Sequence, residues 1–239
     1  MIKLQLDSSN LPKHIAIIMD GNRRYAQKNK LLKLKGHEHG AKKVGEVLDW
    51  CKEFNIKELT LYTFSVQNFK RAPEEINYLF KLFERYFKKF INDKNIYKNK
   101  IKINFIGRIE LFPINIQKMV EELKQKTKLH DKFILNFAFG YGGREEILDA
   151  VKKIAEQVKS GNLLVDEISE QTVQNALYMQ SEPDIVIRTS GERRTSNFLL
   201  WQTNYAELFF IDKLWPEFSK QDFINILNES TQRERRYGK

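Results

Sequence analysis

The sequence HIAIIMDGNRRYAQ, residues 14–27, passes from a short apolar run directly into a cluster of charged and polar side chains. The apolar run at 15–19 has the composition of a strand that is buried on both faces of a parallel sheet. A tight turn after such a strand uses the glycine and the asparagine. Because Asp20, Arg23 and Arg24 go beyond that need, the stretch predicts a first strand with a binding site at its carboxyl end.

Short apolar runs alternate with longer amphipathic segments along the rest of the chain, as they do in α/β proteins. Strands are predicted at residues 15–19, 59–64, 101–106, 133–139, 185–188 and 207–211. Helices are predicted at residues 40–54, 74–90, 114–128, 144–158 and 169–178, and after Ser219. No internal repeat or linker interrupts the sequence. We therefore expect one α/β domain over residues 1–239, with a central, mostly parallel sheet flanked by helices.

The composition limits the classes of partner and compartment. The formal net charge is +10, so a partner is expected to be anionic: phosphate, nucleic acid or an acidic membrane surface. A single cysteine, Cys51, excludes an internal disulfide and suits a reducing compartment. The first residues lack the apolar core of a secretory signal, and no apolar run reaches the ~20 residues needed to span a bilayer. We therefore expect a cytoplasmic protein.

Polar segments follow four of the predicted strands. They are Asp20 with its neighbours, SVQNFKR at 65–71, GYGGRE at 140–145 and RTSGERRTSN at 188–197. The carboxyl ends of parallel strands meet at one edge of a sheet, and ligands of open α/β sheets bind there. We therefore expect the four segments to form one site.

The first of these segments predicts a phosphate site with a metal ion. Gly21 permits close approach of a ligand to the backbone, the following helix offers free N–H groups, and Arg23 and Arg24 add positive charge. A phosphate would repel Asp20 unless a divalent cation lies between them, and Mg²⁺ is the usual partner of diphosphates. The alternative is an Asx-type turn with a helix N-cap and solvated arginines. His37, in KGHEHG, is interpreted as a loop histidine that is either solvated or close to this site.

The other three segments are less specific. Taken alone, the segment at 65–71 is an ordinary connection into a helix. The segment at 188–197 has the composition of an anion site, against the alternative of a solvated basic loop. In GYGGRE, Glu145 stands where a G-x-G-x-x-G motif needs its third glycine, which favours a tight strand-to-helix turn. The sequence also contains no G-x-x-x-x-G-K-[ST] loop, which argues against a nucleotide kinase.

A wide apolar stripe runs along the predicted helix at 74–90. Its members are Ile76, Tyr78, Leu79, Phe80, Leu82, Phe83, Tyr86, Phe87 and Phe90. Such a stripe is usually core, but this one is wide enough to wall a channel for a hydrocarbon as well. We expect Phe83 and Phe87 to be core residues and the flank with Leu82 and Tyr86 to face the channel.

Taken together, these stretches resemble the cis-prenyltransferase family, and most of all the bacterial undecaprenyl diphosphate synthases. The motifs occur in the family's order and spacing from about His14 to Gly238: HIAIIMDGNRRYA, GHEHGAKKV, LTLYTFSVQNFKR, NFAFGYGGREEI, PDIVIRTSGERRTSNFLLWQTNYAELFF and LWPEF. The resemblance implies Mg²⁺-dependent condensation of isopentenyl diphosphate with an allylic diphosphate, usually farnesyl diphosphate. The product would be a long-chain Z-polyprenyl diphosphate, with undecaprenyl diphosphate for the cell-wall lipid carrier expected here. A hydrophobic tunnel beside the sheet would hold the growing chain.

The resemblance also implies roles for individual residues. Asp20 would be catalytic and a metal ligand, Glu207 would be a second metal ligand, and Asn68 would assist proton removal. The allylic diphosphate side would be lined by Gly21, Asn22, Arg23, Arg24, Lys33 and His37. The isopentenyl diphosphate would be held by Arg188, Arg194 and Ser196. Further substrate-contacting positions are Tyr25, Ser65, Val66, Gln67, Phe69, Arg71 and Thr195.

The chain departs from the family's pattern at four of these positions. Tyr25 and Phe69 each stand where the family usually has tryptophan, so aromatic character is kept. Lys33 stands for arginine, which keeps the charge and loses bidentate geometry toward phosphate. Gln67 stands for glutamate, which weakens any mechanism that needs a carboxylate at that place.

The resemblance extends to partners and location. The tail RERRYG resembles the R-x-G ending that reaches the partner subunit's isopentenyl diphosphate site in this family. We therefore expect a homodimer with Arg236 and Gly238 acting in trans, against the alternative of a frayed basic tail. Release of the product implies peripheral contact with the inner face of the cell membrane. The rival interpretation is a basic nucleic-acid-binding module, which needs a continuous basic face, whereas much of the charge here is predicted at strand ends, so we expect no nucleic acid partner.

Overall fold

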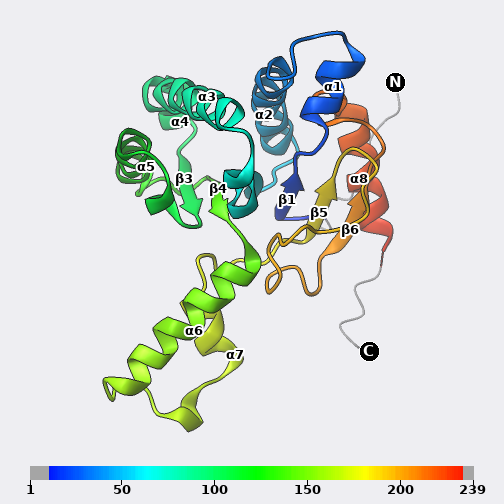
Figure 1. The fold of residues 1–239 in the computed structure, drawn as a ribbon. Helices are drawn as coiled ribbons and strands as arrows, with labels where there is room; N and C mark the ends of the chain where they lie inside the picture. Colours follow the sequence, from blue (N-terminus) through cyan, green and yellow to red (C-terminus); the bar gives the residue numbers. More distant parts are fainter. Residues whose placement is uncertain (1–10, 234–239) are drawn as a thin grey trace.

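The apolar runs of the sequence form the strands of one sheet (Figure 1). The computed structural model describes residues 11–233, and within them the strands are β1 His14–Ile18, β2 Glu58–Ser65, β3 Ile101–Ile106, β4 Phe133–Tyr141, β5 Ile185–Arg188 and β6 Glu207–Phe210. Their order in the sheet is β3-β4-β2-β1-β5-β6, and every neighbouring pair is parallel. The predicted α/β fold with a central parallel sheet is confirmed.

Helices lie between the strands, as the amphipathic segments predict. The α-helices in the described residues are α1 Asn22–Lys28, α2 Lys35–Glu53, α3 Pro73–Asn92, α4 Lys94–Lys98, α5 Ile114–Thr127, α6 Gly143–Lys159, α7 Glu170–Ala176 and α8 Lys220–Gln232. Short 3₁₀ helices are η1 Val66–Lys70, η2 Ile109–Leu111, η3 Val165–Glu167 and η4 Trp215–Glu217. Because α2 begins at Lys35 rather than at residue 40, His37 lies in a helix, and its interpretation as a loop histidine was wrong.

Alternate residues of β1 face two hydrophobic clusters. Ile15 and Ile17 belong to the larger cluster, to which α2, α3, α5 and α8 contribute. Ala16 and Ile18 belong to a smaller cluster that also contains Phe198. All residues of β1 are buried, and each buried isoleucine contributes about 1.5–3 kcal/mol relative to exposure. The sheet is therefore a rigid frame that fixes where each strand ends.

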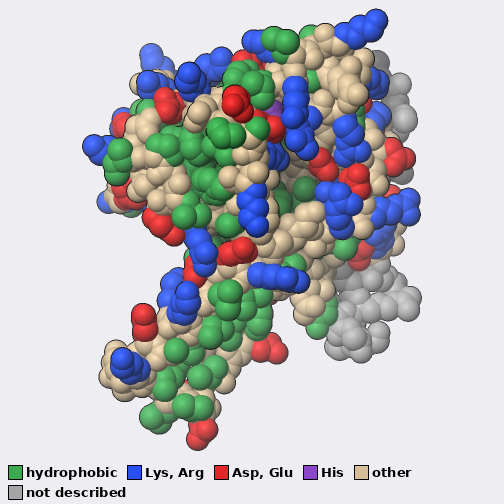
Figure 2. Space-filling model, in the orientation of Figure 1, with side chains coloured by type: hydrophobic (Ala, Val, Ile, Leu, Met, Phe, Trp, Pro, Cys, Tyr) green, Lys and Arg blue, Asp and Glu red, His purple; other side chains and the backbone are tan. Residues whose placement is uncertain are grey.

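Helices α6 and α7 form an arm that projects from the body of the molecule (Figure 1). Apolar side chains on this arm are exposed, and Figure 2 shows them along its length. They are Leu148, Val151, Leu164, Val165 and Ile168. None of the helices within residues 11–233 combines the length and the hydropathy that crossing a membrane requires.

Candidate active site

A cavity of about 830 Å³ opens at the carboxyl ends of the strands. Polar side chains from the loops after β1, β2, β4 and β5 line its mouth, and apolar side chains of α3 and the sheet line its interior. Figure 2 shows the mouth as a hollow in the body of the molecule, with Lys and Arg side chains on its rim. The expected site residues that line the cavity are Asp20, Asn22, His37, Ser65, Gln67, Asn68, Arg71, Arg188 and Ser196. The predicted meeting of the polar loops at one edge is therefore seen in the structure.

Helix α3 supplies the apolar wall of the cavity. The α3 residues that line it are Leu79, Leu82, Phe83, Tyr86, Phe87 and Phe90. Phe83 and Phe87 are core residues and Leu82 and Tyr86 line the cavity, as expected, but the division is not exclusive, because Phe83 and Phe87 line the cavity too. Leu82, Phe83 and Phe87 also belong to the larger hydrophobic cluster. One wide stripe serves both purposes because α3 lies at the border between core and cavity.

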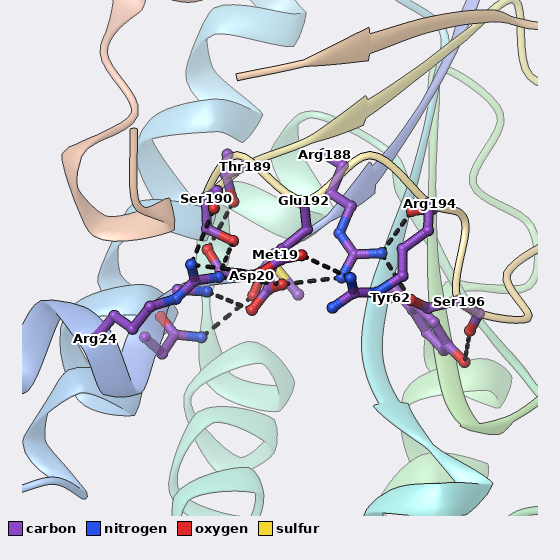
Figure 3. Close-up of polar contacts among 12 residues, drawn as sticks. Met19, Asp20, Arg24, Tyr62, Arg188, Thr189, Ser190, Glu192, Arg194 and Ser196 are labelled. Atoms are coloured by element: carbon purple, nitrogen blue, oxygen red, sulfur yellow. Dashed lines mark hydrogen bonds and ion pairs between the residues drawn. The ribbon is translucent and has the colours of Figure 1, made fainter. Parts of the chain in front are cut away.

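Asp20 lies in the polar mouth, directly after β1 (Figure 3). Its Oδ2 is 2.9 Å from Nη2 of Arg188 and 3.6 Å from Nη2 of Arg24, and its Oδ1 accepts the Gly21 N–H at 2.7 Å. Burial alone would raise the pKa of Asp20, but the hydrogen bond and the charge of Arg188 outweigh it and lower the pKa. Asp20 is therefore ionised at neutral pH, and 33% of its side chain stays exposed to receive a cation.

Arg188, the last residue of β5, is almost completely buried, with 5% of its surface exposed. Its Nη1 donates to the Arg194 carbonyl oxygen at 2.5 Å and to Ser196 Oγ at 2.6 Å (Figure 3). Its Nη2 donates to Asp20, as described above. A guanidinium fixed on three sides in this way presents its charge to the cavity with little freedom to move.

Arg24 extends from α1 toward Asp20 and does not itself line the cavity (Figure 3). Its guanidinium donates to the Ser190 carbonyl oxygen at 3.1 Å and to Ser190 Oγ at 2.5 Å. Glu192 lies between two arginines, 3.6 Å from Arg24 Nη1 and 2.6 Å from Arg194 Nη1. Protein carboxylates thus pair with the arginines around Asp20.

A second group of basic side chains gathers where α1, α2 and the start of α3 meet. Its members converge on the buried Glu75 and are Arg23, Lys33, His37 and Arg71. Burial, followed by the charge of Arg71, lowers the pKa of His37 to about 4, although the charge of Glu75 opposes the shift. His37 is therefore neutral at physiological pH, and the other three side chains carry the positive charge of this group.

Two glycines allow α2 to pack closely against the start of α1. A Cβ at Gly36 would lie 1.9 Å from the Asn22 carbonyl oxygen, and one at Gly40 would lie 2.1 Å from Asn22 Oδ1. Their i, i+4 spacing puts both on one face of α2, so that α2 can lie directly on the start of α1. This contact brings His37 and Asn22 to the same cavity.

The 3₁₀ helix η1 fixes Asn68. The Asn68 Oδ1 accepts the Ser65 N–H at 3.0 Å, so part of this amide holds the turn that carries it. Next to it, Gln67 Nε2 lies 3.3 Å from Glu145 Oε1. Glu145, in the first turn of α6, thus places a carboxylate next to Gln67.

Asn197 is a site residue that the sequence did not reveal. It has a φ of +65°, and Ser196 before it has a φ of +51°. The start of α6 clamps Asn197: Gly143 N–H donates to its carbonyl oxygen at 2.8 Å, and Arg144 N–H donates to its Oδ1 at 2.9 Å. Its Nδ2 donates to Glu145 Oε2 at 3.0 Å. These bonds fix the backbone that carries Ser196, a partner of Arg188.

Several expected site residues lie outside the cavity lining. They are Gly21, Arg23, Arg24, Tyr25, Lys33, Val66, Phe69, Arg194, Thr195 and Glu207. Phe69 packs into the core, with its ring centroid 4.9 Å from that of Phe64 and 5.1 Å from that of Phe112. Tyr25 packs against His39, with 5.2 Å between ring centroids. Arg236 and Gly238 lie outside the described residues.

Glu207 lies at the amino ends of the strands, whereas Asp20 lies at their carboxyl ends. It is the first residue of β6 and pairs with Ile185, whereas the cavity is at the level of Arg188, roughly 10 Å further along the strand. Its Oε2 accepts a hydrogen bond from Arg233 at 2.6 Å. A metal site made of Asp20 and Glu207 of the same chain is therefore not assembled.

The donors and acceptors of the mouth fit a diphosphate with a hard cation. Three buried polar atoms of cavity-lining residues have no hydrogen-bond partner: Asn22 Oδ1, His37 Nε2 and Arg188 Nε. Buried polar groups in such a state are costly unless a ligand satisfies them. Within residues 11–233 no three His, Cys, Asp or Glu side chains gather into a metal site. Asp20 would therefore share a divalent cation with phosphate oxygens, as such sites commonly do.

Comparison with known proteins agrees with this geometry. The family model described as "Putative undecaprenyl diphosphate synthase" matches residues 18–238. A tritrans,polycis-undecaprenyl-diphosphate synthase (geranylgeranyl-diphosphate specific) of Pyrococcus horikoshii is 49% identical over 237 residues, which are 98% of this chain and 90% of that protein.

Two solved structures are similar over nearly the whole chain. Lavandulyl diphosphate synthase from Lavandula x intermedia, in complex with dimethylallyl diphosphate, has a TM-score of 0.92 at 30% identity and covers 97% of this chain and 100% of that one. A probable undecaprenyl diphosphate synthase from Campylobacter jejuni has a TM-score of 0.80 at 32% identity, with 95% and 99% covered. The chain belongs to the undecaprenyl diphosphate synthase family of cis-prenyltransferases and is a cis-prenyl diphosphate synthase.

Proposed function

We propose that the enzyme extends geranylgeranyl diphosphate with isopentenyl diphosphate, in the presence of Mg²⁺, to a long-chain Z-polyprenyl diphosphate. The observation that carries this proposal is a single cavity that joins two cation groups to an apolar interior. The primer is taken from the relatives, since those of Pyrococcus horikoshii and Thermococcus kodakarensis are both named as geranylgeranyl-diphosphate specific. The farnesyl primer expected from the sequence is not confirmed. Undecaprenyl diphosphate, as a precursor of a cell-wall lipid carrier, is the proposed product.

The two cation groups suit the two diphosphates of the reaction. The C1–O bond of the allylic primer breaks, and its electron pair leaves with the diphosphate. C1 then bonds to C4 of isopentenyl diphosphate, and C2 of that unit loses a proton. Negative charge therefore gathers on the departing diphosphate, and fixed cations aimed at its oxygens lower the barrier. We place this diphosphate beside Arg71 and the isopentenyl diphosphate beside Arg188 and Ser196.

Asp20 pairs with Arg188, lines the same cavity as Arg71, and is the proposed holder of Mg²⁺. When bound, the ion would neutralise charge that develops on the diphosphate. Arg188 orients the Asp20 carboxylate and keeps it ionised. Asn68 lies on the same mouth, where its amide would help to orient the isopentenyl unit as the proton leaves. Holding both substrates in this geometry is itself a large part of the rate enhancement.

The apolar interior accounts for elongation. Each CH₂ group that enters it gains about 0.8 kcal/mol by leaving water. Phe90 and Phe137 line the interior of the cavity, away from the diphosphate groups at the strand ends. The length of the product would then be set by how far the hydrocarbon can advance past such side chains.

We also propose that the enzyme is a homodimer that uses the exposed arm of α6 and α7. Exposed Leu148 and Val151 on α6 face solvent in the single chain, at 56% and 55% exposure. Apolar patches of this kind mark protein interfaces. The variant Leu148→Glu should shift the molar mass measured by light scattering from that of a dimer toward that of a monomer. A monomeric wild-type protein would refute the homodimer.

The proposed reaction is tested by incubating the enzyme with labelled isopentenyl diphosphate and one primer at a time, with Mg²⁺ or with EDTA. We expect Mg²⁺-dependent incorporation, with kcat/KM at least tenfold higher for geranylgeranyl than for farnesyl diphosphate. Products are then resolved by chain length. A preference for farnesyl diphosphate would overturn the proposed primer, and no incorporation with either would overturn the proposed reaction.

A further inference from the structure

Glu75 lies at the centre of the cation group on the allylic side. Its Oε1 accepts a hydrogen bond from Arg71 Nη1 at 3.0 Å and lies 3.6 Å from His37 Nε2. Its Oε2 lies 3.4 Å from Lys33 Nζ and 3.7 Å from Arg23 Nη1. Four side chains from α1, the α1–α2 connection, α2 and the end of η1 thus converge on one carboxylate.

Glu75 is placed behind these cations rather than among the groups that face the substrate. It is 5% exposed and does not line the cavity, whereas Arg71 and His37 do. It follows Pro73 in the first turn of α3, where the helix dipole also favours a negative charge. Burial alone would raise the pKa of Glu75, but the charges of Arg71 and Arg23 outweigh it and lower the pKa. Glu75 therefore carries a full negative charge in the enzyme at neutral pH.

A buried negative charge in a site for a diphosphate calls for an explanation. Asp20 is explained by Mg²⁺, but Glu75 cannot share a cation with a ligand that it does not touch. Its charge must weaken the attraction between this site and any diphosphate, because it partly cancels Arg23, Lys33 and Arg71. In the reaction proposed above, every condensation leaves a diphosphate in this site, and that diphosphate has to leave before the next cycle.

We propose that Glu75 is a positioning residue that serves as the resident counterion of the allylic diphosphate site. When no diphosphate is bound, Glu75 pairs with these cations and neutralises part of their charge. When inorganic diphosphate has formed, Glu75 competes for the same cations and hastens its release. This inference rests on the proposed assignment of the allylic diphosphate to this side of the cavity.

The proposal predicts the direction in which affinity changes when the charge is removed. Arg23, Lys33 and Arg71 are three positive charges opposed by one negative charge, and Glu75→Gln removes the negative charge while it keeps the shape and one acceptor oxygen. Binding of an anion should become tighter. If Glu75 were only a structural support for the cations, its loss would let them scatter, and binding should become weaker. The sign of the change separates the two roles.

The test measures binding of inorganic pyrophosphate with Mg²⁺ by calorimetry and its inhibition constant in the elongation assay. We expect Glu75→Gln to bind pyrophosphate about tenfold more tightly, which corresponds to about 1.4 kcal/mol, and to show a lower kcat. Glu74→Gln is the matched control, because Glu74 is the exposed neighbour in the same helical turn. It removes the same charge and should change the affinity less than twofold.

A second variant separates charge from shape. Glu75→Asp keeps the charge and should bind pyrophosphate within about threefold of wild type, whereas Glu75→Ser removes the charge and replaces Glu75→Gln if that variant does not fold. Unchanged or weaker binding in a folded, uncharged variant would overturn the counterion role. Because calorimetry does not depend on turnover, this result stays distinct from a failure of the wild-type enzyme to elongate either primer, which would overturn the proposed function instead.

Discussion

Arg188 is held by the end of a strand, whereas Arg23 and Lys33 belong to a short helix and its following connection at the surface. Arg188 is 5% exposed and donates to a carbonyl, a hydroxyl and a carboxylate. The side chains of Arg23 and Lys33 are 53% and 61% exposed, and Glu75 is the carboxylate beside both of them. The group around Arg188, here called the strand-end side, is therefore preorganised by the sheet. The group around Glu75, here called the helix side, depends on a counterion.

This difference matches the tasks proposed for the two sides. The isopentenyl unit has to be held in one geometry so that its alkene can attack, which a rigid strand end provides. The allylic side has to bind a diphosphate and then release it in every cycle. Side chains that are exposed and loosely paired can exchange partners at a lower cost than a buried arginine can.

The largest effect is expected at Asp20, which lines the cavity that the two sides share. Asp20→Ala should reduce kcat on the order of 10³-fold, because a group that stabilises charge in the transition state is lost together with a proposed metal ligand. Circular dichroism should show a folded protein, and calorimetry should show that the primer still binds. Asp166→Ala, which removes an exposed carboxylate from η3, is the control and should keep wild-type turnover. A folded Asp20→Ala enzyme with full turnover would contradict the proposed role of Asp20.

On the helix side, His37 should make the stability of the protein depend on pH. The pKa of His37 is about 4 in the folded protein and about 6.5 in the unfolded chain. The unfolded chain therefore takes up this proton first, and the free energy of unfolding should fall by about 2–3 kcal/mol between pH 6.5 and pH 4 on this account. His37→Gln should remove that part of the slope in denaturant titrations. Equal slopes for variant and wild type would show that His37 does not titrate in this way.

Loss of the hydrogen bonds that hold Asn197 should weaken binding on the strand-end side. Asn197→Ala loses two side-chain hydrogen bonds and places a β-carbon in the left-handed region, so the KM for isopentenyl diphosphate should rise about tenfold. Asn197→Gly keeps the backbone conformation and should cause a smaller rise. The KM for the primer should stay within twofold in both variants. A parallel rise in both KM values would indicate general loosening of the mouth instead.

A change in the apolar interior should leave both diphosphate sides intact. Leu82→Trp adds volume to the cavity wall, so the longest product should be shorter by at least one isoprene unit at a similar initial rate. Leu111→Trp is the control, because Leu111 is 46% exposed and does not line the cavity. Thin-layer separation of the labelled products gives the result. Products of wild-type length from Leu82→Trp would show that this wall does not limit elongation.

The strands and the meeting of the polar loops could be predicted because buried parallel strands leave continuous apolar runs in the sequence. The start of α2 could not, since the residue before it, Leu34, makes no side-chain cap that would mark a helix start. Glu207 was assigned from its motif alone. Motif spacing does not reveal the strand register that puts Glu207 at the amino ends of the strands, away from the cavity.

Glu75 and Asn197 could not be recognised from the sequence for a different reason. In the sequence Glu75 is an ordinary acid in the first turn of a helix that begins with proline, and Asn197 is an ordinary loop asparagine. What distinguishes them is contact with residues far along the chain: Glu75 with Arg23, and Asn197 with the start of α6. Such contacts arise only once the sheet has placed the loops side by side.

The most direct test of two separate diphosphate sites is a pair of KM measurements on Arg188→Lys and Arg71→Lys. Lysine keeps the charge and loses the planar fork that matches a phosphate. Separate sites predict that Arg188→Lys raises the KM for isopentenyl diphosphate about tenfold and leaves the KM for the primer within twofold, and that Arg71→Lys does the reverse. Equal increases of both KM values in both variants would contradict the division of the cavity into two sites.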